Sequence, residues 1–522
     1  MFDYKPSRRR FLTVSSAVLG TAVLGGAEML LEACAGTSNT GATVKKGGTL
    51  TMGMAGDPPI MDPHRATQGV YHHTVRSTVF EGLTHVKQDL SQEPRLAESW
   101  TTSSDGLTVT FKLRQGVTFH DGSPFTAQDV VFNIQRIQDK SFGSAWAPYV
   151  NTVEQVTAVD DHTVRFQLSV PTPALFANLG SIMIISQKSA GTIDKHPVGT
   201  GPFQFVEWVP GDHIKVTKFA NYWQAGKPYL DGILFKPLPD AQSAVTALQT
   251  GGISLLEDTA PQYVQTVQSM SNVAVSPSPP ILQLECYQFN TQRFADKRVR
   301  QALSYAFPRK DYVQSFWYNL SRPSVNFFVK EMPVYLPDSD DLTASFDVSK
   351  ANSLLQQAGY TKDNPLKIEI LTPNFAPTRK QGALLLQNNL NQLGHKVTIA
   401  DVETSTWVDR IEAHAQYDVT VVRYDVLPAD PSGIFNSEML SPSFNLSRWS
   451  TSDYADKVAG AAKELDTQKR ISDYQDLQRL VLDEVPIFTI NHMPIIPSML
   501  KTVKGLVVGP DAVWDYSAVS IS

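Results

Sequence analysis

The chain has 522 residues, of which 42% are hydrophobic and 18% charged, and its net charge at pH 7 is −6. This length exceeds what one hydrophobic core usually serves, so we expect two or more lobes. The acidic balance argues against a nucleic-acid partner, and no Lys/Arg cluster interleaved with aromatic residues occurs in the sequence. The two cysteines, Cys34 and Cys286, exclude a disulfide framework as the main source of stability.

Residues 1–33 have the features of an export signal. Arg8 and Arg9 precede a segment of mostly small and apolar residues, which is the order found in twin-arginine signals. A permanent transmembrane anchor is the alternative, because about 20 apolar residues can span a bilayer. Glu28 and Glu32 lie at the far end of the segment, where a carboxylate is costly, so we favour the signal.

The end of this signal has two candidate cleavage sites. Leu31 to Cys34 resembles a lipobox, in which Cys34 is acylated and becomes the new N-terminus. Ala33 and Ala35 also satisfy the small-residue rule for ordinary signal peptidase. Residues 34–46 have the composition of a flexible polar tether, which favours acylation. We therefore expect an exported, periplasmic or cell-surface protein that is anchored to the membrane through Cys34.

Strand and helix patterns alternate through the rest of the chain. Residues 108–113 and 162–168 alternate apolar with polar side chains, as half-buried strands do. Between them, Thr126 and Asp129 form a capping-box pattern ahead of a helix. The same two periods recur as helical stripes at 299–307, 384–393 and 471–481 and as strand patterns at 366–371 and 417–422. The sequence therefore predicts an α/β protein without internal repeats.

Two extended runs, residues 281–289 and 485–491, divide the chain. The first follows a proline-rich break at 276–280. We expect both runs to cross between an outer lobe made of the two chain ends and an inner lobe made of the middle. The predicted bounds are 47–280 for lobe I with an inserted subdomain at about 85–195, 281–490 for lobe II, and 491–522 for a return to lobe I.

Catalytic motifs are absent from the sequence. There is no Gly-x-Ser-x-Gly elbow, no phosphate loop ending in Gly-Lys-Ser/Thr and no His-Glu-x-x-His. The adjacent pair His72 and His73 would point about 100° apart in a helix, so chelation by that pair is not expected. We expect no enzymatic activity, no metal and no cofactor. A secreted hydrolase with a site that no motif reveals is the remote alternative.

Several segments together resemble the extracytoplasmic solute-binding proteins of the oligopeptide/dipeptide/nickel family, which feed ABC importers. The most specific one begins Leu96-Ala-Glu-Ser-Trp100 and continues to Val131. The other matches follow in family order at 197–203, 289–303 and 347–360 and at Arg470, Tyr474, Gln478 and Pro486. Pro308 and Ser254 depart from the family pattern, which has acidic residues at these positions.

The resemblance implies an α/β, two-lobed periplasmic-binding-protein fold with an extra subdomain, joined by two hinge strands. A solute would bind between the lobes and close them together. The implied partners are a peptide or small-molecule ligand and the permease subunits of an ABC importer. The chain is expected to be a monomer that makes and breaks no covalent bond.

The identity of the ligand depends on one segment. In peptide-binding relatives, an Asp in a Trp-x-x-Asp segment ahead of Asp-Pro or Glu-Pro receives the α-ammonium of the peptide. Aligned on Asp430 and Pro431, this pattern places Tyr424 at the aromatic position and Leu427 at the carboxylate position. An ammonium buried against a leucine lacks a partner, which is costly. Asp425 is the replacement candidate, although in an extended segment it faces away from Tyr424.

We therefore predict a peptide or peptide-like ligand, with a non-peptide solute such as an oligosaccharide as the alternative. Oligosaccharide sites favour aromatic platforms, for which Trp407, Tyr424 and Trp449 are candidates. Trp and Tyr are mostly buried in any fold, so the core is the competing location for Trp407 and Trp449. The resemblance implies that Tyr424 lies on the cleft.

Four polar residues complete the candidate ligand-binding set. Gln68 and Tyr71 follow a segment that resembles the first pocket loop of the family. Asn290 and Asn491 lie near the two crossings, where they contact either the ligand or the hinge backbone. Cys286, in the first crossing run, is predicted to be a small buried hydrophobic side chain.

Overall fold

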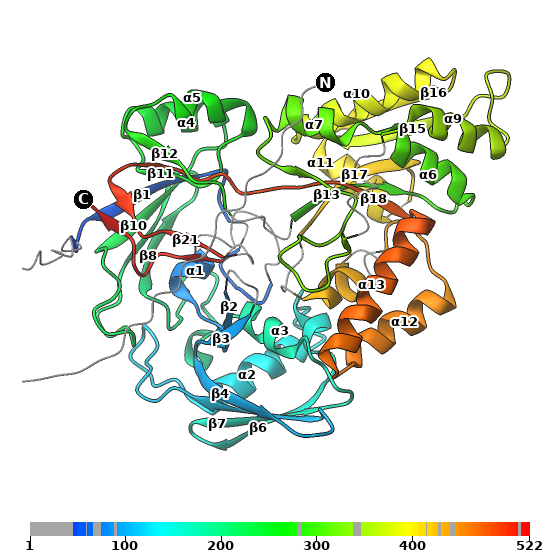
Figure 1. Cartoon of the computed structure of the whole chain (residues 1–522). Coiled ribbons are helices and arrows are strands. Elements are labelled where there is room, and N and C mark those ends of the chain that lie inside the picture. The colour runs from blue at the N-terminus through cyan, green and yellow to red at the C-terminus, as the bar shows by residue number, and fades with distance from the viewer. Residues whose placement is uncertain are drawn as a thin grey trace, which may run out of the picture. The chain divides into compact units, whose positions relative to one another are not determined.

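The computed structural model describes residues 45–58, 60–65, 75–87, 91–278, 283–337, 346–413, 415–425, 430–438, 445–509 and 513–522. These residues form two large sheets, each with its own hydrophobic core, and a smaller third sheet (Figure 1). Within these residues, no helix combines the length and the apolar character needed to cross a membrane. The arrangement of two sheets and two cores is the predicted two-lobed α/β fold.

Lobe I is built on a mixed sheet of seven described strands in the order β12-β19-β11-β1-β10-β9-β8. Its central strand β1 (Thr49–Met54) runs parallel to β10 (Gly232–Pro237) and to β11 (Leu255–Leu256). Alternate residues of β1 point into the core. The other strands are β8 (Phe203–Val209), β9 (His213–Lys218), β12 (Val273–Val275) and β19 (Ser498–Leu500).

Lobe II is built on a sheet of six described strands in the order β14-β18-β13-β17-β15-β16. Its strands are β13 (Gln283–Phe289), β14 (Arg322–Pro323), β15 (Lys367–Pro373), β16 (Lys396–Val402), β17 (Val419–Asp425) and β18 (Ile487–His492). Every residue of β13 and β18 is buried, as is typical of central strands covered on both faces. The helices of this lobe include α6 (Lys297–Ala306), α7 (Arg309–Phe316), α9 (Val348–Gln357), α10 (Pro377–Gln392), α12 (Ser452–Lys463) and α13 (Thr467–Glu484).

The inserted subdomain of lobe I is an antiparallel sheet in the order β4-β5-β7-β6 with two helices. Its elements are β4 (Ala97–Thr102), β5 (Thr108–Leu113), β6 (Val153–Asp160), β7 (Thr163–Leu168), α2 (Ala127–Gln138) and α3 (Leu175–Ser181). The two predicted strands correspond to β5 and β7. The predicted capping box is present, because the backbone N–H of Thr126 donates to Oδ2 of Asp129 at 2.9 Å.

Shorter elements complete the fold. The strands are β2 (Thr84–Val86), β3 (Gln92–Pro94), β20 (Val503–Lys504), β21 (Val507–Val508), β22 (Trp514–Asp515) and β23 (Ser520–Ile521). The helices are α1 (Val75–Val79), α4 (Ala241–Gln249), α5 (Val264–Gln268) and α11 (Thr404–Val408). Single turns of 3₁₀ or π geometry occupy Ala147–Val150, Gln187–Ser189, Pro261–Tyr263, Asp409–Ala413 and Gly433–Glu438.

Two segments connect the lobes beside the predicted crossing runs, which themselves form strands β13 and β18 of the lobe II sheet. One leads from β12 into β13, and the other leads from β18 into β19. They lie side by side, because the backbone N–H of Ser276 donates to the carbonyl of Pro497 and that of Ser278 donates to the carbonyl of Ile495. The hydroxyl of Ser278 also accepts a hydrogen bond from the N–H of Ile495 at 3.1 Å. The crossings therefore form a paired ribbon between the two sheets.

Candidate functional site

Strand direction identifies the edge of each sheet where a solute can bind. In lobe I, β1 and β11 are parallel, and the end of β11 pairs with Ser498, where the second crossing enters β19. In lobe II, β15 and β17 are parallel, and β17 ends at Asp425, which pairs with Gln283 at the start of β13. Ligands of open α/β sheets bind outside the carboxyl ends of the strands. Both carboxyl edges adjoin the paired ribbon between the sheets. The candidate site therefore lies at this place, which we call the hinge edge.

Two acidic residues follow the last strand position of β11. The side chain of Glu257 is buried, and its backbone N–H donates to the carbonyl of Gly53 in β1. Burial, reinforced by the neighbouring charge of Asp258, raises the pKa of Glu257 well above its ordinary value. Both effects disfavour the ionised form of the Glu257 side chain.

Asp258 differs from its neighbour in exposure and in charge. Its side chain is open to solvent, and its Oδ1 accepts a hydrogen bond from the backbone N–H of Ile496 at 2.9 Å. Desolvation by the surrounding protein raises its pKa to about 6, against the lowering effects of the Ile496 N–H and the Arg423 guanidinium. Asp258 therefore combines an exposed side chain with a carboxylate that the surrounding protein desolvates. At pH 7 this carboxylate carries a negative charge.

Lobe II contributes a cationic side chain, Arg423, near the two acids that follow β11. Arg423 lies in β17 directly opposite Glu285 of β13, and its side chain is exposed. Burial raises the pKa of both Glu285 and Asp258, and the positive charge of Arg423 opposes both shifts, so its guanidinium acts on groups of both lobes. Opposite charges therefore come from the two sides of the hinge: a carboxylate after β11 and a guanidinium near the end of β17.

A buried cluster of polar side chains supports β13, the strand that pairs with Arg423. Glu285 is buried in β13, where its Oε2 accepts a hydrogen bond from the hydroxyl of Tyr312 at 2.7 Å. Its Oε1 lies 3.5 Å from Nε of Arg379. Burial raises the pKa of Glu285, and Arg379 opposes that shift. These contacts connect β13 with α7 and α10, which gives the hinge strand a fixed base in lobe II.

The three aromatic candidates lie within lobe II. Tyr424 is 7% exposed, and its hydroxyl donates to Oε1 of Gln288 at 2.7 Å. Nε1 of the half-buried Trp407 donates to Oγ1 of Thr420 at 2.9 Å. Trp449 is 7% exposed and packs edge-on against another aromatic ring in the core of the lobe. None of these three rings forms an open platform in this conformation.

The two asparagine candidates are buried as well. Nδ2 of Asn290 donates to the carbonyl of Ala415 at 3.0 Å, and its Oδ1 accepts from the backbone N–H of Gln292. Nδ2 of Asn491 donates to the hydroxyl of Ser321 at 2.9 Å. These contacts hold lobe II loops against the ends of the two central strands. The structure therefore places both side chains in local hydrogen bonding.

The remaining sequence candidates are outside the described part of the chain: Cys34, Gln68, Tyr71, Leu427 and the side chain of Asp425. Motif reading missed Glu257, Asp258 and Arg423. The available signal was a pair of acids directly after a short apolar run, but its meaning depends on the direction of that run in the sheet. Cys286 is fully buried, and burial raises the pKa of its thiol to about 12.

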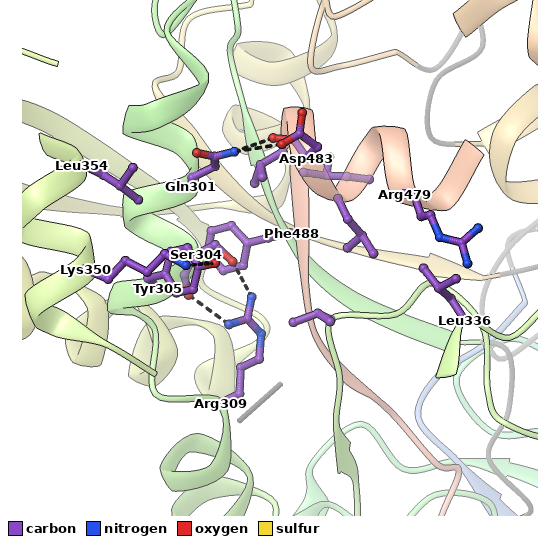
Figure 2. A pocket seen from close by; sticks show the side chains of 14 residues that line it. Gln301, Ser304, Tyr305, Arg309, Leu336, Lys350, Leu354, Arg479, Asp483 and Phe488 are labelled. Atoms are coloured by element: carbon purple, nitrogen blue, oxygen red, sulfur yellow. Dashed lines mark hydrogen bonds between the residues drawn. The ribbon is translucent and has the colours of Figure 1, made fainter. Parts of the chain in front are cut away.

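A separate cavity of about 500 Å³ lies within lobe II, between α6, α9, α13 and β18 (Figure 2). Its floor is apolar, and the polar side chains around it are engaged. Arg309 is buried and donates to the carbonyls of Thr489 and Ser304, and Nζ of Lys350 donates to the hydroxyl of Tyr305. Its lining includes no residue of β1, β11 or β17. We therefore place the candidate solute site at the hinge edge.

The hinge edge has no metal-binding geometry in the part of the chain that the structure describes. No group of three or more His, Cys, Asp or Glu side chains there is arranged to hold a metal ion. The chemistry available at the edge is a solvent-open carboxylate, a buried acid whose pKa is raised, and a guanidinium. Such groups bind charged and hydrogen-bonding solutes.

Comparison with known proteins gives concordant matches. The model of the family described as bacterial extracellular solute-binding proteins, family 5, middle, matches residues 91–443. A glutathione-binding protein of Pectobacterium atrosepticum is 28% identical over 484 residues, which cover 88% of this chain and 92% of the relative. Di/tripeptide-binding protein 2 of Pseudomonas aeruginosa is 26% identical over 513 residues, which cover 91% and 95%.

A solved structure matches the fold over a similar length. It is the periplasmic binding protein DppA from Helicobacter pylori, associated with an ABC transporter, in complex with the peptide STSA. It superimposes with a TM-score of 0.79 at 26% identity, and the match covers 91% of this chain and 98% of that chain. The shared fold therefore spans nearly the whole of both chains.

Proposed function

We propose, from the premise that this chain belongs to family 5 of the bacterial extracellular solute-binding proteins, that it captures a peptide or peptide-like solute for an ABC importer. The single observation that carries the proposal is the family match over 91–443, which includes most of both lobes. Relatives that bind glutathione, di- and tripeptides and the peptide STSA support a peptide ligand. The oligosaccharide alternative has no such support among these relatives.

The mechanism that we propose is closure on the solute. A solute at the hinge edge contacts the carboxyl ends of strands from both lobes, so it binds the closed form more tightly than the open form. That difference in affinity shifts the population toward the closed form, which the permease then recognises. The lobe bounds of this proposal are those predicted from the sequence, 47–280 with 491–522 and 281–490. The chain changes no covalent bond and acts as a monomer.

The test is the native mass of the chain purified from Thr43 onward without denaturation. Added masses that match short peptides are expected. A sharp adduct of hexose multiples, or closure with sugars only, would overturn the peptide ligand in favour of an oligosaccharide. Turnover of a model ester or peptide substrate by the same preparation would overturn the binding-protein function in favour of a secreted hydrolase.

We also propose that residues 1–33 are a twin-arginine export signal and that Cys34 is acylated, with 34–46 as the tether between lipid and lobe I. The motif and the composition of the tether support this assignment. Mass spectrometry of the N-terminal peptide from cell membranes is the test. A lipid-modified Cys34 is expected at the N-terminus, whereas an unmodified N-terminus beyond residue 34 would contradict the anchor.

A further inference from the structure

We propose that Asp258 binds the free amino group of the solute, so that the importer selects ligands with an unblocked ammonium. The inference rests on the proposed function and deepens it, because it names the side chain and the ligand group that meet. It departs from the pattern of peptide-binding relatives, in which the ammonium partner lies at the position of Leu427. The carboxylate comes instead from the opposite lobe.

The first support is the location of Asp258. It follows β11 at the carboxyl edge of lobe I, and Oδ1 is held by the backbone N–H of Ile496. Ile496 belongs to the second crossing segment, so this carboxylate is fixed directly beside the hinge. A ligand group bound there adjoins both lobes, which is the placement that closure requires.

The second support is the free acceptor capacity of this carboxylate. An ionised carboxylate has about four acceptor sites on its two oxygens. Among the described residues, Oδ1 accepts one hydrogen bond and Oδ2 accepts none. The side chain is also open to solvent, so an ammonium with three donors can reach it. Asp258 thus has the charge, the acceptors and the access that an ammonium site needs.

The third support is the distribution of charge around the edge. Burial raises the pKa of Glu257 and so disfavours a second negative charge beside Asp258. Arg423 places a positive charge on the lobe II side. An amine directed to Asp258 and a carboxylate directed to Arg423 is the orientation that these opposite charges favour. The favoured ligand class is therefore a small zwitterion such as a short peptide with both termini free.

The charge state of Asp258 gives the inference a pH signature. With a pKa of about 6, the carboxylate is charged at pH 7.5 and mostly protonated at pH 5. Only the charged form binds an ammonium strongly, so affinity for free-amine ligands falls as pH drops through 6. Burial raises the pKa of Glu257 well above its ordinary value, and the Ile496 contact is a backbone group that does not titrate in this range. The signature therefore belongs to Asp258.

Calorimetric titration with alanine peptides of two to five residues, with free or acetylated N-termini, tests the inference. The wild type is expected to bind the free-amine forms at least about tenfold more tightly at pH 7.5. Its affinity for them should fall roughly tenfold at pH 5, because about one Asp258 in ten is ionised there. Asp258→Asn should lose both the preference and the pH dependence, and Asp258→Glu should restore part of each.

The matched control is Asp240→Asn, the same charge change at the N-cap of α4 in lobe I, where Asn caps equally well. It should bind as the wild type does. An Asp258→Asn protein that retains the wild-type preference and pH dependence would overturn the inference and leave the importer function standing. A wild type that binds none of the free peptides would overturn the peptide function and this inference with it.

Discussion

Two carboxylates of lobe I have opposite surroundings. Glu81 is 3% exposed and has a full set of partners: Nε of Arg95 at 2.8 Å, and the hydroxyl of Thr200, the hydroxyl of Tyr222 and Nε1 of Trp223, each at 2.9 Å. Asp258 is open to solvent and has one backbone partner. A carboxylate whose acceptors are all used holds its own lobe together. One whose acceptors are unused beside a hinge is available to a ligand.

The largest expected effect comes from removing the satisfied carboxylate. Glu81→Ala leaves the mostly buried Arg95 without its counter-ion and also removes the acceptor from three donors. We expect a loss of about 3–5 kcal/mol in the free energy of unfolding, measured by urea denaturation. Asp258→Ala should change that free energy by only about 1 kcal/mol or less. Equal losses in the two variants would break the contrast between a structural and a ligand-binding carboxylate.

A pH experiment extends the contrast to the hinge strand. His492 ends β18, where burial lowers its pKa to about 4 and its Nε2 lies 3.1 Å from the carbonyl oxygen of Asn326. The unfolded chain protonates this histidine near pH 6.5, above the folded pKa, so protonation favours unfolding. Its contribution to stability is therefore complete above pH 6.5 and is lost as pH falls toward 4. The slope in that window is about 1.4 kcal/mol per pH unit.

His492→Gln should remove that slope. Urea denaturation of both proteins at intervals from pH 4 to pH 7 measures the difference. Ligand affinity near pH 6 separates this histidine from Asp258: the variant should keep the fall in affinity for free-amine peptides. If the variant lost the pH dependence of both peptide affinity and the free energy of unfolding, the pH signature would belong to His492 and not to Asp258.

The capping box of α2 gives a smaller test of the side chains that stabilise the fold and do not bind the ligand. Thr126→Ala removes the hydroxyl that caps the helix, next to Asp129. We expect a loss of about 1 kcal/mol in the free energy of unfolding with unchanged affinity for peptides. Thr126→Ser keeps the hydroxyl and serves as the control. A change in affinity would mean that the inserted subdomain contributes to the solute site.

The smallest expected effect concerns a contact between the inserted subdomain and lobe II. A methyl group on Gly106 would lie 2.9 Å from Cδ1 of Leu465, so these two segments touch in the present conformation. Under the proposed closure the open form lacks this contact, and Leu465→Ala removes part of it. We expect a roughly twofold loss of ligand affinity, about 0.4 kcal/mol, in calorimetry, with the free energy of unfolding within about 0.5 kcal/mol of wild type. Unchanged affinity would show that closure does not depend on this contact.

The fold was largely predictable from the sequence because its signals are local. The alternation at 108–113, the capping box at Thr126 and the two extended runs each depend on neighbouring residues, and each corresponds to an element of the structure. The family resemblance then supplied the order of the elements. Agreement between local pattern and overall fold is what a well-specified sequence provides.

The candidate site was not predictable to the same degree. Identifying Asp258 as a candidate ligand-binding residue requires the direction of β11. It also requires the pairing of β11 with Ser498, which is more than two hundred residues away in the chain. The sequence does not reveal which face of β17 carries Arg423 and which buries Tyr424, because a shift of one residue in register exchanges the two faces. Trp407 and Trp449 were chosen by residue type, and residue type alone does not separate a platform from a core ring.

The paired crossing ribbon has a consequence for how the protein moves. A single connecting segment between two lobes lets them rotate about more than one axis. Two crossing segments joined by the hydrogen bonds of Ser276 and Ser278 allow the lobes to rotate about one axis and resist rotation about the other. In the proposed closure, we expect the lobes to return to the same alignment each time. In the proposed importer function, a hinge of this kind gives the permease one geometry of the closed state for every solute.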